Sequence, residues 1–234
     1  MMTARSTAGA AFSDRADAGR QLARSLAVLA KGPTAILALP RGGVPVAAEI
    51  AVALEAPLDI VLVRKIGVPH QPEYAMGAIA EGDPPVVVRN EAVLRALRIS
   101  DRAFDDARQR EAVELERRRR AYRGDRAPLD VANRTVILVD DGIATGMTMR
   151  AAALAVNKRL ASRVVIAAPV IAHDVAADMR HEFADVICVE EPDDLYSVGR
   201  FYADFSQVGD DEVREILKHH DGRSVIATGS SSGH

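Results

Sequence analysis

Two adjacent carboxylates in the chain stand where a sugar phosphate could bind. Asp140 and Asp141 follow an apolar run that ends at Val139, and a turn with glycines and threonines comes next. In open α/β sheets, ligands bind at the carboxyl ends of the strands, and the following helix offers free N–H groups to an anion. The acids would accept hydrogen bonds from vicinal hydroxyls, while the turn amides, Thr145 and Thr148 would hold a phosphate. An acidic turn with a helix cap is the purely structural alternative.

A second candidate phosphate loop comes earlier in the chain. Arg41, Gly42 and Gly43 follow the apolar residues 35–39 and precede a stretch with helical character. The glycines expose backbone amides to an oxyanion, and the Arg41 guanidinium can donate a planar pair of hydrogen bonds to phosphate oxygens. An Arg-Gly-Gly turn alone is usually structural, but its place between a strand and a helix, ahead of the acid pair, favours a binding role.

Glycines and prolines interrupt the chain after a basic pair, Arg64 and Lys65. The interruptions predict an excursion from the main fold that contains two short strands, near 76–80 and 86–89. Residues 66–74 contain two prolines and a glycine. We therefore expect 66–74 to lack regular structure and to form a mobile loop anchored at the basic pair.

Aromatic residues gather near the end of the chain. Three of the nine aromatics lie within 196–202, in a sequence with only 4% aromatic content. Such a cluster favours a stacking surface for a planar base, with Tyr196 as its first member. A small aromatic core is the alternative.

The elements that must position these residues follow a repeating order. Apolar residues at helical spacing predict a helix over 13–30, capped by Ser13 or Asp14, and further helices over 45–55 and 149–160. Buried strands alternating with helices predict an α/β fold, in which a mainly parallel, twisted sheet carries helices on both faces. The strands are expected from short apolar runs at 35–39, 59–63, 136–139, 164–168 and 186–189.

We expect residues 1–221 to form one domain. Its core would span about 34–189, and a small hood would come from 1–33, from 190–221, or from both. Residues 101–122 are highly charged, and the pairs Glu114 with Arg118 and Glu116 with Arg120 predict a solvated helix. The polar, glycine-containing residues 222–234 are expected to form a disordered tail.

Composition narrows the class of protein. The 234 residues carry a formal charge of −3, which gives no excess of positive charge for a nucleic-acid backbone or an anionic membrane. No apolar run approaches the roughly 20 residues that span a bilayer. The single cysteine, Cys188, excludes an internal disulfide framework and is expected to be inert core in a strand. These features predict a soluble, cytoplasmic protein with no nucleic-acid or membrane partner.

The acid pair and its turn resemble the phosphate-binding segment of the type I phosphoribosyltransferases, whose substrate is 5-phosphoribosyl 1-pyrophosphate (PRPP). The resemblance covers most of the chain. It implies that Asp140 and Asp141 hold the ribose hydroxyls and that the loop at Arg41, Gly42 and Gly43 holds pyrophosphate, with a cis non-proline peptide at Pro40–Arg41 or Arg41–Gly42. It assigns the 5-phosphate cradle to Ala144, Thr145, Gly146, Met147 and Thr148.

The same resemblance implies further roles. The loop after Arg64 and Lys65 would close over PRPP as a lid, with one of these two residues neutralising the leaving pyrophosphate. Tyr196 would stack on the base. Magnesium would be held by Asp140, Asp141 and Asp204, although Asp204 is one residue displaced from the family pattern.

Two positions depart from the family pattern. Gly142 replaces a usually apolar residue, which predicts a looser loop. Ala144 replaces the aspartate typical of enzymes that act on 6-oxopurines, so hypoxanthine and guanine become weaker substrate expectations.

The expected reaction transfers the phosphoribosyl group of PRPP to a ring nitrogen of a nucleobase, with release of pyrophosphate. Orientation and charge stabilisation would carry catalysis, without a covalent nucleophile. One alternative is a regulatory protein that senses PRPP or a nucleotide and contacts a partner through the helix containing Arg117 to Arg120. Another is metal-dependent hydrolysis of a phosphate ester, which no further histidine and carboxylate cluster supports. A homodimer is left open as the assembly.

Overall fold

The structure is a computed structural model that describes residues 10–30 and 32–227. Within these residues, one sheet has five strands, all parallel, in the order β2-β1-β6-β7-β8. This arrangement confirms the predicted parallel α/β fold. The strands are β1 Thr34–Ala38, β2 Leu58–Ile60, β6 Thr135–Val139, β7 Arg163–Ala167 and β8 Asp185–Ile187.

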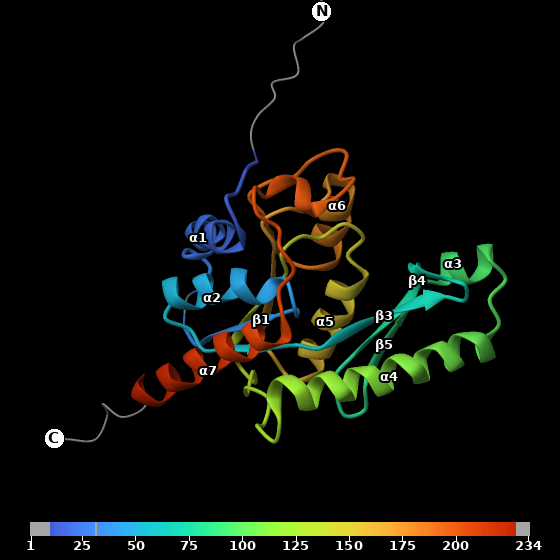
Figure 1. Cartoon of the computed structure of the whole chain (residues 1–234), viewed down its shortest axis with the longest axis horizontal. Helices are drawn as coiled ribbons and strands as arrows, with labels where there is room; N and C mark the ends of the chain where they lie inside the picture. The colour runs from blue at the N-terminus through green and yellow to red at the C-terminus, as the bar shows by residue number, and fades with distance from the viewer. Residues whose placement is uncertain (1–9, 31, 228–234) are drawn as a thin grey trace, which may run out of the picture.

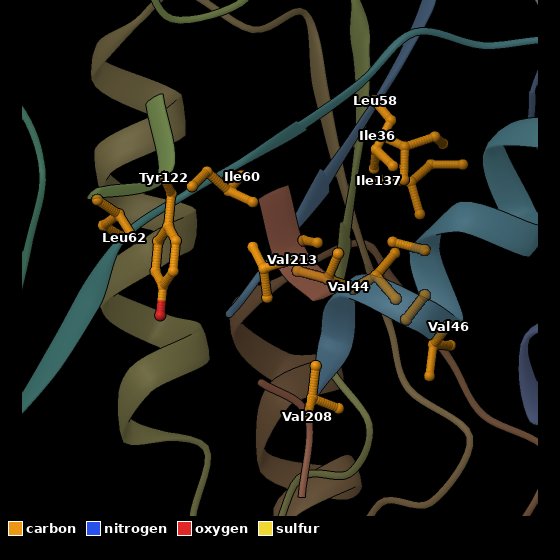
Figure 2. Close-up of a cluster of buried hydrophobic side chains, with 14 of the residues drawn as sticks. Ile36, Val44, Val46, Leu58, Ile60, Leu62, Tyr122, Ile137, Val208 and Val213 are labelled. Atoms are coloured by element: carbon orange, nitrogen blue, oxygen red, sulfur yellow. The ribbon is translucent and has the colours of Figure 1, made fainter. Parts of the chain in front are cut away.

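The strands are mostly apolar because both faces of the sheet are covered. Ile36 and Ile137 point into one core cluster, while Leu37 and Leu138 point into the other. Figure 2 shows the first of these clusters, where Ile36 and Ile137 lie beside Val44 of the second helix. All five residues of β1 and of β6 are buried.

Helices cover the two faces in separate groups. On one face pack α1 (Arg15–Leu26), α2 (Gly43–Ala53) and α7 (Asp210–Ala227). On the other face pack α5 (Met147–Lys158) and α6 (His173–Glu182). Asp14 caps α1 by accepting a hydrogen bond from the Asp17 amide at 2.7 Å, as the sequence predicts.

A second sheet lies beside the main one and, with two helices, forms an extension that we call the arm (Figure 1). Among the described residues, this sheet has three antiparallel strands, ordered β3-β4-β5. The arm consists of β3 Val63–Val68, β4 Gln71–Ala80, β5 Val86–Arg89, α3 Glu91–Ala96 and α4 Asp101–Arg123.

The expectation that residues 66–74 lack regular structure is wrong. Strand β3 continues to Val68 and β4 begins at Gln71, so the segment is a hairpin with its turn at Pro69 and His70. Ile66 and Val68 alternate with more exposed neighbours and bury one face of the hairpin. The second proline is tolerated because 72–74 fall in a register shift between the pairs that involve Gln71 and Ala75.

Charged residues of helix α4 form ion pairs with one another along the helix, as predicted. Glu114 contacts Arg118 at 3.0 Å and Glu116 contacts Arg120 at 2.8 Å. The end of the helix carries a feature that the sequence did not reveal, because the Arg123 side chain is only 1% exposed. It donates to Glu81 at 2.8 Å and to Asp59 at 3.3 Å, and so fixes the arm to β2.

Both segments proposed for the hood pack against each other. The Phe12 and Tyr202 backbones form a bridge, and their rings lie 5.3 Å apart. A short 3-10 helix, Val198–Phe201, lies in this region. Helix α7 runs to Ala227 and therefore includes the beginning of the segment expected to be a tail; the remaining tail positions, 228–234, lie outside the described residues. In the part of the chain that is described, no helix is long and apolar enough to cross a membrane.

Candidate active site

The two predicted phosphate loops lie side by side because β1 and β6 are neighbours in the sheet. A Cβ atom on Gly43 would lie 2.6 Å from the carbonyl oxygen of Val139, and one on Gly42 would lie 1.9 Å from Asp141 Oδ2. Glycine at position 43 therefore allows the two backbones to approach this closely, and glycine at position 42 leaves room for the Asp141 carboxylate. The Pro40–Arg41 peptide is cis, as the family resemblance predicts.

The turn after the acid pair leads directly into α5. Gly146 adopts a φ of 71°, a left-handed conformation that favours glycine, and the helix begins at the next residue. Ala144 and Thr145 are exposed, while Thr148 is partly buried. Arg150 Nη1 donates to the Thr145 carbonyl at 3.2 Å, and its Nε donates to Glu182. The turn is thereby fixed with the amino end of α5 behind it, an arrangement that can bind a phosphate.

The acid pair is partly withdrawn from water. Asp140 Oδ1 accepts a hydrogen bond from the Asp141 amide at 2.9 Å. Burial, together with the neighbouring Asp141 carboxylate, raises the pKa of Asp140 well above its ordinary value. Burial also raises the pKa of Asp141, against the opposing effect of the Arg15 guanidinium.

A position at a strand end predicts that both acids face solvent, and this prediction is wrong for Asp141, whose side chain is 17% exposed. Arg15 covers it from the first turn of α1, with Nε donating to Asp141 Oδ2 at 2.8 Å. Arg15 Nη1 also donates to the Ser206 carbonyl at 2.8 Å, and its guanidinium lies 3.9 Å from the centre of the Phe205 ring. No spacing signal could have found this contact, because Arg15 and Asp141 lie 126 positions apart.

Arg41 points toward the start of α7. Its Nη1 lies 3.5 Å from Asp210 Oδ1, and the same oxygen accepts a hydrogen bond from the Tyr122 hydroxyl at 2.6 Å. The Arg41 guanidinium is one-third exposed and so remains accessible to an anion.

The basic pair belongs to the arm. Arg64 Nη2 lies 2.9 Å from Glu111 Oε2 in α4, and Arg64 Nε bonds the same oxygen. Lys65 is the next residue of β3 and pairs in register with Ala78. In this structure the guanidinium of Arg64 therefore stabilises the junction of the arm sheet with α4.

The aromatic residues near the end of the chain divide between the two predicted roles. Tyr202 is 5% exposed, packs with Phe12, and donates its hydroxyl to the Asp141 carbonyl at 2.6 Å. Tyr196 is 80% exposed, with Arg200 near its ring. Tyr202 thus belongs to a small aromatic core, and Tyr196 presents an open ring face.

Asp204 does not join the acid pair. Its Oδ1 accepts a hydrogen bond from the Ser206 amide at 2.9 Å, and the residue is exposed. Across the described residues, no three acidic, histidine or cysteine side chains form a group that could hold a metal ion. The described residues therefore do not bring Asp204 into one group with Asp140 and Asp141, as the expected magnesium set requires.

Gly142 is explained by packing. A Cβ atom at this position would lie 2.4 Å from a methyl carbon of Val198. The valine thus occupies the space that an apolar side chain at position 142 would need. The hood thus supplies an apolar contact at this position, and the expectation of a looser loop stays a prediction.

Comparisons with known proteins agree with this architecture. Residues 13–206 match the family described as phosphoribosyl transferase domain. Two curated proteins from Mycobacterium tuberculosis strains, named as candidate phosphoribosyl transferases, are 44% identical over 206 residues, which is 88% of this chain and 46% of theirs. The chain thus spans about half the length of these relatives.

A solved structure, that of TT1426 from Thermus thermophilus, is similar over almost its whole length. It shares 39% identity with a TM-score of 0.76, and the match covers 89% of this chain and 98% of that one. The matched domain spans both predicted phosphate loops and the hood contact at Tyr202, and the chain belongs to the phosphoribosyl transferase domain family.

Proposed function

We propose that the protein transfers the 5-phosphoribosyl group of PRPP to a nitrogenous base. A ring nitrogen of the base attacks C1 of the ribose, the C1–O bond to pyrophosphate breaks, and pyrophosphate leaves. The contact between the two loops supports this proposal most directly, because Gly42 lies against Asp141 and so brings a candidate pyrophosphate loop to the acids that would hold the ribose.

The residues around this contact have complementary chemistry. Asp140 and Asp141 would accept hydrogen bonds from ribose hydroxyls, and the turn at Thr145 and Gly146 would hold the 5-phosphate at the start of α5. Arg41 would bind the pyrophosphate end, where its guanidinium is accessible. Charge stabilisation and orientation would then suffice for the transfer, without a covalent intermediate on the protein.

Magnesium fits the acid pair. Carboxylate oxygens are the ligands that this hard cation prefers, and two adjacent carboxyl side chains, Asp140 and Asp141, stand together at the end of β6. When bound, the cation would supply positive charge to the pyrophosphate oxygens. Asp140 is the better candidate ligand, because the Asp141 carboxylate is paired with the Arg15 guanidinium, whereas Asp140 Oδ1 accepts from a neutral backbone amide.

The acceptor site would lie under the hood, near Ala144 and Tyr196. Ala144 offers no proton acceptor, which favours a base other than hypoxanthine or guanine. The exposed ring of Tyr196 could stack on a planar base. A cytoplasmic location suits the single free thiol of Cys188.

A PRPP-sensing role on the same fold is the second candidate, and the structure offers it little support. Its proposed contact surface, the helix with Arg117 to Arg120, carries arginines that each pair with Glu114 or Glu116. Such pairing leaves less free positive charge for a partner.

Pyrophosphate release from PRPP and magnesium tests the two candidates. Adenine, uracil, orotate, xanthine and guanine would be offered separately, and we expect release with at least one of them. Asp140→Asn should abolish release, whereas Asp193→Asn, at an exposed acidic position, should retain it. PRPP binding by calorimetry without release for any base would favour the sensing role, and absence of PRPP binding would refute both.

A further inference from the structure

We propose that Arg15 is a positioning residue of the PRPP site: from α1, it holds the Asp141 carboxylate against the pyrophosphate loop and leaves Asp140 as the acid that meets the ligand. This inference rests on the proposed function and adds a residue to its site. It also gives α1 and the hood a direct part in binding PRPP.

The guanidinium of Arg15 is fixed from three directions. Its Nε donates to Asp141 Oδ2 at 2.8 Å, its Nη1 donates to the Ser206 carbonyl at 2.8 Å, and its plane lies over the Phe205 ring at 3.9 Å. The Arg15 side chain is 11% exposed. A buried, charge-assisted contact of this kind is stronger than a surface ion pair, which water and salt weaken.

Asp141 passes this constraint on to the first loop. Asp141 Oδ2, which accepts the hydrogen bond from Arg15, is also the atom nearest to the place that a Cβ atom on Gly42 would occupy. A continuous chain of contacts therefore runs from Arg15 through Asp141 to the loop that begins at Arg41. If Arg15 were removed, the carboxylate would lose its partner in a buried position and would rotate, or take up a proton, beside Gly42.

The two acids consequently differ in their surroundings. The Asp141 carboxylate is paired with the Arg15 guanidinium. In addition, the Tyr202 hydroxyl donates a hydrogen bond to the Asp141 backbone carbonyl at 2.6 Å. The Asp140 carboxylate accepts a hydrogen bond from the Asp141 amide, and its own backbone amide donates to the Ala167 carbonyl at 3.3 Å. Arg15 thus offsets the negative charge of Asp141 beside Asp140, and we expect Asp140 to be the acid that meets the ribose hydroxyls or a cation.

A cavity beside Arg15 makes the inference testable by chemical rescue. It has a volume of about 200 Å³ and is lined by residues that include Arg15, Asp14, Pro45 and Ser206. Shortening Arg15 to alanine would enlarge this space and open it to a small cation. Free guanidinium could then take the place of the missing side chain between Asp141 and Phe205.

The first experiment measures PRPP binding, with magnesium, by calorimetry in a double-mutant cycle. Arg15→Ala should weaken PRPP binding about tenfold or more, as expected for loss of a hydrogen bond to a charged group. Because Arg15 acts through Asp141, adding Arg15→Ala to Asp141→Asn should weaken binding little further. Arg20→Ala is the matched control: Arg20 lies on the same helix, is 53% exposed, and contacts Glu49 instead.

The second experiment adds millimolar guanidinium chloride to the Arg15→Ala protein, with sodium chloride as the control salt. Guanidinium should recover part of the lost PRPP affinity in Arg15→Ala and leave Arg20→Ala unchanged. A merely structural role for Arg15 predicts instead that the losses from Arg15→Ala and Asp141→Asn add, and that guanidinium gives no recovery beyond sodium; either result overturns the inference. Wild-type protein that binds no PRPP would overturn the proposed function, and this inference with it.

Discussion

Gly42 and Asp141 follow two different strands of the main sheet. They lie so close together that the Asp141 carboxylate occupies the space that a side chain at position 42 would need. A Cβ atom on Gly42 would lie 1.9 Å from Asp141 Oδ2, well inside any allowed contact. The carboxylate cannot move aside freely, because Arg15 holds the same oxygen. The relative position of the two phosphate loops is therefore set by one glycine and one hydrogen-bonded acid.

Gly42→Ala should destabilise the protein by about 1–3 kcal/mol, the usual effect of forcing extra volume into a packed site. It should also weaken PRPP binding, because Asp141 must turn away. Urea unfolding and calorimetry would measure the two effects. In an Asp141→Ala background the destabilisation by Gly42→Ala should largely disappear; an equal loss in both backgrounds would show that the clash lies elsewhere.

Arg123→Met should be among the most destabilising substitutions in the arm. The side chain is 1% exposed and compensates Asp59 and Glu81, which are 3% and 13% exposed. Breaking a buried ion pair from one side costs about 3–5 kcal/mol, because the remaining charges stay buried. Arg126→Met is the control, since Arg126 also contacts Asp59 but is 31% exposed. A smaller loss in free energy of unfolding for Arg123→Met than for Arg126→Met would contradict this reading.

Cys188 should react slowly with thiol reagents in the folded protein. Burial, together with its hydrogen bond to Glu191, raises the pKa of the thiol to about 11. Relative to the ordinary value of 9.0, this shift leaves about a hundred-fold less thiolate at pH 8. Alkylation by iodoacetamide, followed by mass spectrometry, should be much faster in the urea-unfolded protein. Glu191→Gln should speed the reaction of the folded form; comparable rates in folded and unfolded wild type would refute the shielding.

Proteolysis of the hairpin should be confined to its tip. Strand pairing protects Val63 to Ile66 and Ala75 to Ala80, whereas the turn at Pro69 and the register shift at 72–74 lack regular pairing. Limited digestion with mapped cleavage sites should therefore find cuts only within 69–74. PRPP with magnesium should slow these cuts if the tip closes over the ligand, as a lid would. Cleavage between Arg64 and Ile66 would show that the hairpin opens as a whole.

The sequence predicted what depends on local pattern. Buried runs without alternation identified the five parallel strands, and the loops at Arg41 and at Asp140 were recognised because each lies within a few residues of a strand end. The hairpin was missed for a physical reason: prolines signal a break, but β4 absorbs Pro72 in a register shift that only strand pairing reveals.

Contacts between distant segments were also missed. The partners Arg15 and Asp141 are 126 positions apart, and Arg123 and Asp59 are 64 apart. An arginine at a helix end is compatible with a solvated position, so nothing local marks it as buried. The exposure of Asp141 was misjudged for the same reason, since the residue that covers it comes from the other end of the family domain.

Helix α5 connects the phosphate turn with the arm. Its first residue, Met147, packs on the small sheet, and Ala151 and Ala155 form one buried cluster with Ala78 and Val86. If the ligand binds only while α5 is packed on the arm, linkage makes it stabilise that packed state. Amide hydrogens of β4 and β5, distant in sequence from the acid pair, would then exchange more slowly when the phosphate turn is filled, and would report its occupancy.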